Sequence, residues 1–151
     1  MTTIAPRPCK LCLEINPDPQ EFRRASGWLR AGGSYLGVPE EQIDRLELCL
    51  NEVLANILEH GGDVVANHPI QLELRASALP SGFEAQLLVS DRGEPFDSGR
   101  ASLRPLPGSL EQARPGGLGL RLVKAFSDDM GYRVLEGGNE LTITMHWTPL
   151  S

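Results

Sequence analysis

The 151-residue chain has little cysteine, few aromatic residues and no long hydrophobic run. Its three cysteines are an odd number in a chain long enough to bury its own core, which argues against a disulfide framework. No apolar stretch approaches the roughly 18 residues of a membrane-spanning helix, and residues 1–9 lack the apolar core of a signal peptide. We therefore expect a cytoplasmic protein with no membrane partner.

Positive charge is also scarce. Fourteen Lys and Arg residues stand against twenty Asp and Glu residues, which gives a net charge of -6. Binding to a phosphate backbone needs a broad basic surface, so the composition argues against a nucleic-acid partner. With 40% hydrophobic and 23% charged residues, the chain has the profile of a soluble globular protein, and we expect a single domain over residues 1–151.

Cys9 and Cys12 have the spacing of a redox pair or of half a zinc site. A zinc site needs four ligands, and the other cysteine, Cys49, lies far along the chain in an apolar helical pattern. Residues 9–15 alternate like a strand, which would send the two side chains to opposite faces. We expect both cysteines to be structural.

Hydrophobic periodicity predicts the order of the elements. They are a strand ending near Ile15, helices beginning near Pro19 and Glu40, a hairpin over 70–89, a helix opened by 116–120, and strands over 132–136 and 140–147. This order has too few strand-helix-strand repeats for a doubly wound parallel sheet. It predicts an α+β fold, in which an antiparallel or mixed sheet is covered on one face by about three helices.

Local signals refine the first and third helices. Asp18 is a predicted N-cap and Glu21 its capping-box partner, while Gly32 and Gly33 should weaken the end of the first helix. In the third helix, four residues are expected to form the buried apolar face: Leu118, Leu122, Ala125 and Phe126.

The segment from residue 92 to residue 115 shows no periodicity but contains four prolines and three glycines. Structureless stretches of more than about 15 residues are uncommon in compact domains, and many of them are functional lids. We expect residues 94–115 to form a lid over a binding site.

Three motifs could carry chemistry, and the first lies on the second helix. Glu52, Asn56 and His60 are spaced four apart and share one flank, away from the apolar stripe. One interpretation is an ordinary solvated polar face. The other is a ligand site, because asparagine is a mediocre helix former whose amide oxygen can bind a metal.

The second motif ends a strand. Asp91 has the same parity as Leu87 and Val89, so its carboxylate should point inward and needs a partner there. A ligand with N–H donors could be that partner, approaching the backbone at Gly93. The alternative is an aspartate bonded to its own turn.

The third motif is the glycine-rich junction at residues 115–120. Such a junction exposes backbone N–H groups and the positive end of a helix to a phosphate. It matches neither the P-loop nor the dinucleotide-binding spacing.

In this order, the three motifs resemble those of the Bergerat-type ATP-binding fold shared by histidine kinases, gyrase and mismatch-repair ATPases, the GHKL superfamily. Within it, the sequence is most similar to the stand-alone anti-sigma-factor serine/threonine kinases of bacterial partner-switching systems. The matching stretches are residues 46–60, 89–96 and 117–129. The resemblance extends from about Leu11 to Trp147.

This resemblance implies roles for the motif residues. Asn56 would bind the Mg²⁺ that bridges the nucleotide phosphates, and Glu52 would activate the attacking hydroxyl. Asp91, with Gly93 beside it, would accept a hydrogen bond from the adenine amino group. The residues implied near the phosphates are His60, Arg114, Gly116, Gly117, Leu118, Gly119 and Leu120. Asn139 stands where some relatives carry a threonine, and we do not count it as a site residue.

The implied reaction is transfer of a phosphoryl group from ATP to a serine of a STAS-type anti-sigma-factor antagonist. The other implied partner is an RNA polymerase sigma factor, held until the unphosphorylated antagonist displaces it, and homodimers are common in the family. An alternative is a regulatory module that binds nucleotide but acts by contact alone, which the presence of Glu52 argues against. If all three motifs are incidental, the protein should bind no nucleotide.

Overall fold

The computed structural model describes residues 9–60, 68–92 and 115–149. Its elements are, in chain order, β1 (Cys9–Ile15), α1 (Pro19–Tyr35), α2 (Glu40–His60), β2 (Ile70–Leu79), β3 (Gly82–Asp91), α5 (Pro115–Phe126), β4 (Asp129–Leu135) and β5 (Gly138–Trp147). The predicted lid falls outside the described residues, apart from Pro115, which is the first residue of α5.

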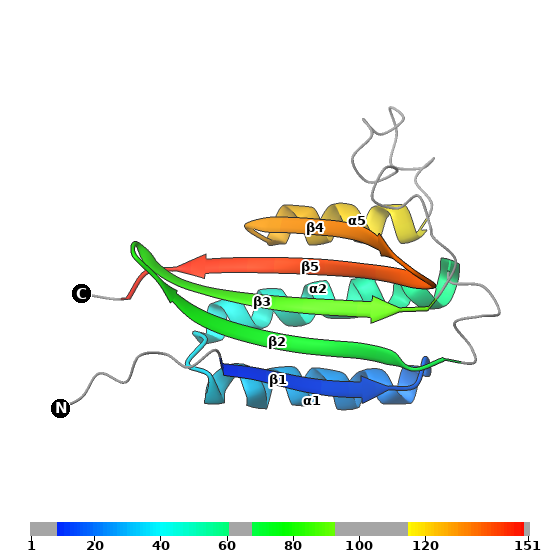
Figure 1. The fold of residues 1–151 in the computed structure, drawn as a ribbon, viewed down its shortest axis with the longest axis horizontal. Helices are drawn as coiled ribbons and strands as arrows, with labels where there is room; N and C mark the ends of the chain where they lie inside the picture. The colour runs from blue at the N-terminus through cyan, green and yellow to red at the C-terminus, as the bar shows by residue number, and fades with distance from the viewer. Residues whose placement is uncertain (1–8, 61–67, 93–114, 150–151) are drawn as a thin grey trace.

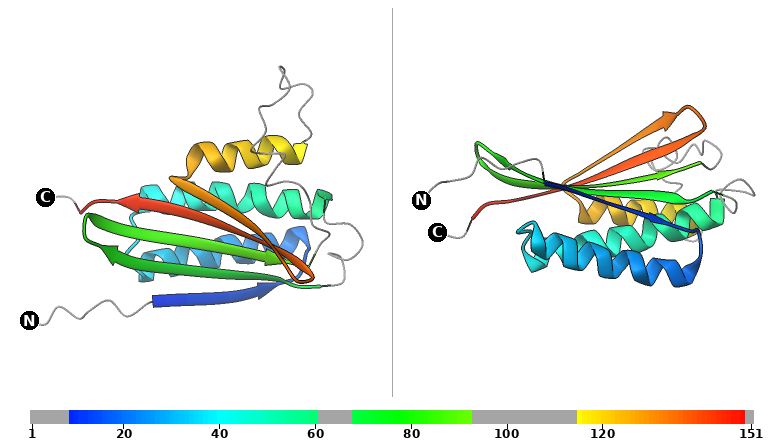
Figure 2. Two further views of the ribbon diagram at one scale, coloured as in Figure 1. Left: turned by 45° about the horizontal axis from the view of Figure 1, so that its top comes forward. Right: turned by 60° about the horizontal axis from the view of Figure 1, so that its bottom comes forward.

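The five described strands form one sheet in the order β1-β2-β3-β5-β4, and all four pairings are antiparallel. The three described helices lie side by side on one face of this sheet, with α2 between α1 and α5 (Figure 1; Figure 2, right). The α+β prediction is therefore confirmed, and the sheet is antiparallel rather than mixed among the strands described.

The core fills the space between the sheet and the helices. Alternate strand residues point to the helices, as the predicted hairpin required, and Leu72, Leu87 and Ile143 are at most 1% exposed. They pack on the apolar stripe of α2, where Leu46, Leu50 and Leu54 are fully buried. None of the helices in the described ranges is long and apolar enough to cross a membrane.

The first helix begins where the sequence predicted it. The Asp18 side chain accepts a hydrogen bond from the Gln20 N–H at 2.9 Å, which satisfies one of the free donors of the first turn. The capping-box prediction for Glu21 is wrong in its partner. Its carboxylate accepts from the Asn16 N–H at 3.1 Å, because the Asp18 N–H is already bonded to the Asn16 carbonyl.

Gly32 and Gly33 lie within the last turns of α1. The helix continues through both residues to Tyr35, and the chain turns at Gly37, which has φ +86°. Both glycines are buried. A methyl group on Gly33 would lie 2.9 Å from Cγ1 of Ile43, so these residues allow α1 to pack closely on its neighbours.

This close packing gives a stability prediction with a control in the same helix. Gly33→Ala should lower the free energy of unfolding by about 1 kcal/mol, because overpacking against the buried Ile43 outweighs the gain in helix propensity. Gly27→Ala should raise it by about 0.5–1 kcal/mol, since no atom lies within 4 Å of the added carbon. Urea denaturation followed by circular dichroism measures both. Equal stabilisation by the two substitutions would contradict the packing argument.

The predicted apolar face of α5 needs correction. Val123 is fully buried, whereas Ala125 is exposed and Phe126 is 40% exposed. The side chain of Leu118 is not described. The α5 helix packs against α2 through Val123, whose carbonyl lies 3.9 Å from the Cys49 sulfur, so its buried stripe is rotated from the predicted one.

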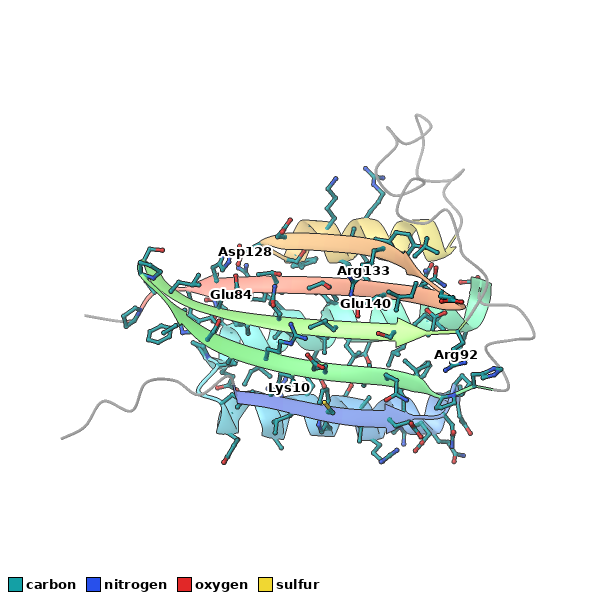
Figure 3. All side chains as sticks on the ribbon, viewed as in Figure 1. Lys10, Glu84, Arg92, Asp128, Arg133 and Glu140 are labelled. Atoms are coloured by element: carbon teal, nitrogen blue, oxygen red, sulfur yellow. The ribbon has the colours of Figure 1, made fainter. Side chains whose placement is uncertain are left out.

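The uncovered face of the sheet is polar and carries charges of both signs (Figure 3). Cys12 is an exposed free thiol on this face. Oppositely charged side chains on neighbouring strands of this face pair with one another. Examples are Arg133 with Glu140 at 2.9 Å, His146 with Glu84 at 2.9 Å, and Lys10 with Glu73 at 3.9 Å.

Candidate functional site

The elements that carry the three motifs meet at one end of the molecule. The C-terminal end of α2, the end of β3 and the first turn of α5 all lie there, as both ribbon views show (Figures 1 and 2). The motifs are far apart in the sequence, and the antiparallel arrangement of α2 and α5 brings them to the same edge. This edge is the candidate functional site.

The first motif lies on the flank of α2 that faces α5. Asn56 is only 3% exposed, and its side chain makes no hydrogen bond to any residue in the described part of the chain. Glu52, one turn earlier, is half-buried and has no ion-pair partner among the described residues. The interpretation as an ordinary solvated face therefore does not fit Asn56.

The environment of Cys49 shows how little water reaches this flank. Cys49 precedes Glu52 by one turn and is 1% exposed. Burial, together with the negative charge of Glu52, raises the pKa of the Cys49 thiol to about 12. The thiol therefore stays neutral near pH 7.

The second motif is held by a chain of hydrogen bonds across three strands. Asp91 is 7% exposed and points to the helix-covered side, as its parity predicted. Its Oδ1 accepts a hydrogen bond from Nδ2 of Asn139 at 3.1 Å, and Oδ1 of Asn139 accepts from the Tyr132 hydroxyl at 2.5 Å. Asn139, which was not among the predicted site residues, is the cross-strand partner of Asp91.

Gly138 brings the backbone of β5 against the end of β3. A Cβ at this position would clash with the Asp91 carbonyl oxygen and lie 3.2 Å from Cα of Arg92. The preceding Gly137 makes the turn between β4 and β5 with φ +81°. The tight contact of Gly138 with Asp91 depends on strand pairing that no local sequence pattern reveals.

The remaining predicted residues are only partly described. His60 is the last residue of α2, and Gly93 and Arg114 lie outside the described residues. Residues 116–120 lie in the first turns of α5, within the helix rather than before it, and their side chains are not described. The first turn of a helix still presents unpaired N–H groups and positive dipole charge.

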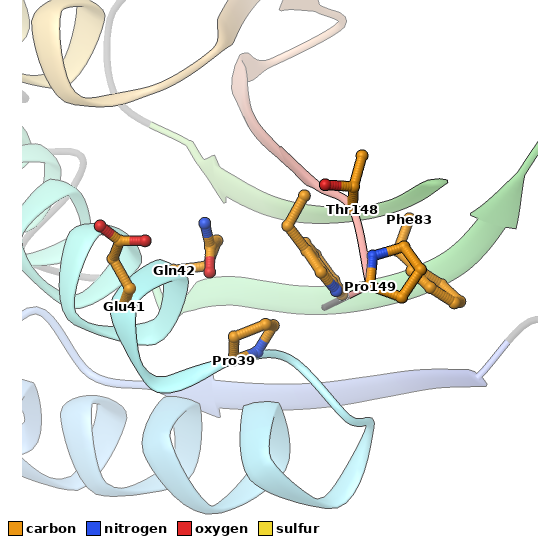
Figure 4. A pocket seen from close by; sticks show the side chains of 7 residues that line it. Pro39, Glu41, Gln42, Phe83, Thr148 and Pro149 are labelled. Carbon is orange, nitrogen blue, oxygen red and sulfur yellow. The ribbon is translucent and has the colours of Figure 1, made fainter. Parts of the chain in front are cut away.

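A pocket of about 530 Å³ lies at the opposite end of β3 and is separate from this site (Figure 4). Phe83 and Trp147, paired across β3 and β5, stack there with ring centroids 5.8 Å apart. The pocket is completed by the start of α2 and the residues that follow β5, and it contains none of the predicted site residues.

Comparison with known proteins agrees with the motifs. The family described as histidine kinase-like ATPase domain matches residues 15–146, which is most of the chain. The chain is also similar to the serine/threonine-protein kinase BtrW of Bordetella bronchiseptica, with 39% identity over 108 residues. The matched part covers 70% of this chain and 72% of BtrW.

Two solved structures are similar in fold. The RsbU and RsbW domains of a Mycobacterium tuberculosis protein match with a TM-score of 0.61 and 18% identity, over 91% of this chain and 32% of that one. The SiaB–SiaC complex from Pseudomonas aeruginosa matches with a TM-score of 0.56 and 13% identity, over 91% and 89% of the two chains. The chain therefore belongs to the histidine kinase-like ATPase domain family, on the branch of anti-sigma-factor serine/threonine kinases that the three motifs predicted.

Proposed function

We propose that the protein is an ATP-dependent serine kinase that phosphorylates a STAS-type anti-sigma-factor antagonist and otherwise sequesters a sigma factor. The observation that carries this proposal is the burial of Asn56, which is 3% exposed and lies one turn from Glu52 on the same helix. Similarity to BtrW, which is named as a serine/threonine kinase, supports the reaction type.

In this proposal each motif has one task. Asp91 accepts a hydrogen bond from the adenine amino group at the end of β3. The first turn of α5, where Gly117 presents a backbone N–H and Gly119 follows in the next turn, holds the phosphates. Glu52 accepts the proton of the serine hydroxyl as it attacks, which makes Glu52 the catalytic base. Burial of this flank keeps competing water out.

The residues present fit a magnesium ion. Mg²⁺ prefers oxygen ligands and is commonly held by one or two protein groups together with substrate phosphates and water. Asn56 offers an amide oxygen that no described residue uses. When bound there, the ion would neutralise phosphate charge during transfer. The rest of the proposed chemistry belongs to the protein, which positions the nucleotide and removes the proton.

The proposal extends to partners and organisation. We infer that the chain acts as one cytoplasmic ATPase domain, and that its protein partners are the antagonist, the sigma factor and a second copy of itself. A kinase of this type needs an exposed route for a protein serine to reach Glu52, and its half-buried position is compatible with that need.

A transfer assay tests the proposal. The purified protein is mixed with radiolabelled ATP, Mg²⁺ and a purified STAS-type antagonist, and label on the antagonist serine is the expected result. An antagonist with alanine in place of that serine is the control. Nucleotide binding without transfer would favour the contact-only regulatory module, and absence of nucleotide binding would refute both functions.

A further inference from the structure

A chain of hydrogen bonds runs from Tyr132 through Asn139 to Asp91, the residue proposed to bind the adenine base. The three side chains come from the adjacent strands β4, β5 and β3. Asn139 is 2% exposed and Asp91 is 7% exposed. In such surroundings a hydrogen bond is strong, and a mismatched pair of donors or acceptors is costly.

Asp91 and Tyr132 together hold the Asn139 amide in one orientation. The Tyr132 hydroxyl donates to Oδ1 of Asn139 at 2.5 Å, so the amide oxygen is turned toward β4. The amide nitrogen is then turned toward β3, where it donates to Oδ1 of Asp91 at 3.1 Å. A flipped amide would set its oxygen against the carboxylate oxygen, which is the costly mismatch, whereas the tyrosine hydroxyl can donate to one end of the amide or accept from the other.

We propose that Asn139 is a positioning residue, held by hydrogen bonds to Asp91 and Tyr132, that makes the site select nucleobases carrying an amino group opposite Asp91. The inference rests on the proposed function and deepens it. Because Asn139 offers Asp91 only N–H donors, it favours the carboxylate as an acceptor with a fixed orientation. An acceptor bonds well to the 6-amino group of adenine and is repelled by the 6-oxo group of guanine.

A purely structural role for the chain makes a different prediction. If these hydrogen bonds served only to satisfy the polar groups of the three side chains, they would stabilise the fold. Removing one of them would then weaken the binding of every nucleotide alike. A selectivity role changes the ratio between nucleotides that differ only at the 6-position. The ratio of affinities therefore separates the two roles.

The experiment compares ATP with purine riboside triphosphate, which lacks the 6-amino group, and with GTP. Affinities are measured by calorimetry with Mg²⁺ for the wild type, Asn139→Ala and Tyr132→Phe. In Asn139→Ala the preference for ATP over the purine analogue should fall about fivefold, and in Tyr132→Phe about threefold, as expected for loss of one hydrogen bond of the chain. Tyr35→Phe is the control, because it removes the same hydroxyl from a side chain that is 82% exposed.

Equal weakening of all three nucleotides in both variants would overturn the inference and leave a structural role. Tyr132→Phe changes one atom and carries the test if Asn139→Ala does not fold, which circular dichroism reports. If the wild type bound none of the three nucleotides, the proposed function itself would fail, so the two failures are distinguishable.

Discussion

Glu52→Gln should slow phosphoryl transfer to the antagonist serine at least about a hundredfold, while ATP affinity stays within a few-fold of wild type. The substitution keeps the shape of the side chain and removes the base, and general-base catalysis contributes about 10² to 10⁴ in rate. Nucleotide binding should survive because Glu52 is assigned to the incoming hydroxyl rather than to ATP. Single-turnover transfer and calorimetry measure the two quantities.

Glu59→Gln is the matched control for this prediction. Glu59 lies on the same helix, is exposed, and loses the same charge. Its transfer rate should equal that of the wild type. Transfer by Glu52→Gln at the wild-type rate would show that Glu52 is not the base, whatever the nucleotide affinity.

The second large effect is expected at the proposed adenine site, where Asp91→Asn should weaken ATP binding more than about tenfold. The Asn139 amide presents its nitrogen to position 91, so an asparagine there would turn its oxygen to Asn139. Its own N–H₂ group would then face the adenine amino group, and two donors would meet. Loss of a charged acceptor costs about 1.5 kcal/mol or more, which is about tenfold in affinity.

Calorimetric titration with ATP and Mg²⁺ measures this loss. Asp129→Asn serves as the control, since it changes the same group at an exposed position at the start of β4 and should bind ATP like the wild type. An Asp91→Asn variant with unchanged affinity would remove Asp91 from the site.

Local patterns predicted most of the fold, because they are properties of neighbouring residues. The alternation in β2 and β3, the cap at Asp18 and the long stripe of α2 each follow from a period or a single side chain. What they did not predict depends on tertiary packing. Gly33 and Val123 are buried because another helix lies against them, and the composition of α1 or α5 does not indicate which neighbour that is.

The candidate site divides in the same way. Strand parity predicted that Asp91 points inward. Helical spacing predicted that Glu52 and Asn56 share one flank of α2. The depth at which Asn56 is buried depends on tertiary packing, which helical spacing does not indicate. Asn139 was set aside, because its contact with Asp91 depends on which strands pair and in which register.

The pairing of Asp91 with Asn139 also has a consequence for folding. It lies at the end of the β3–β5 ladder, which joins two hairpins, β2–β3 and β4–β5, that are each local in the chain. Joining them closes a loop of intervening residues, and that step costs conformational entropy before its contacts are gained. A nucleotide that needs Asp91 in place would bind only the joined form, and at a hundred times its dissociation constant it would stabilise that form by about 2.7 kcal/mol. The cellular nucleotide level would thereby set how often the two hairpins separate and expose the core to proteases.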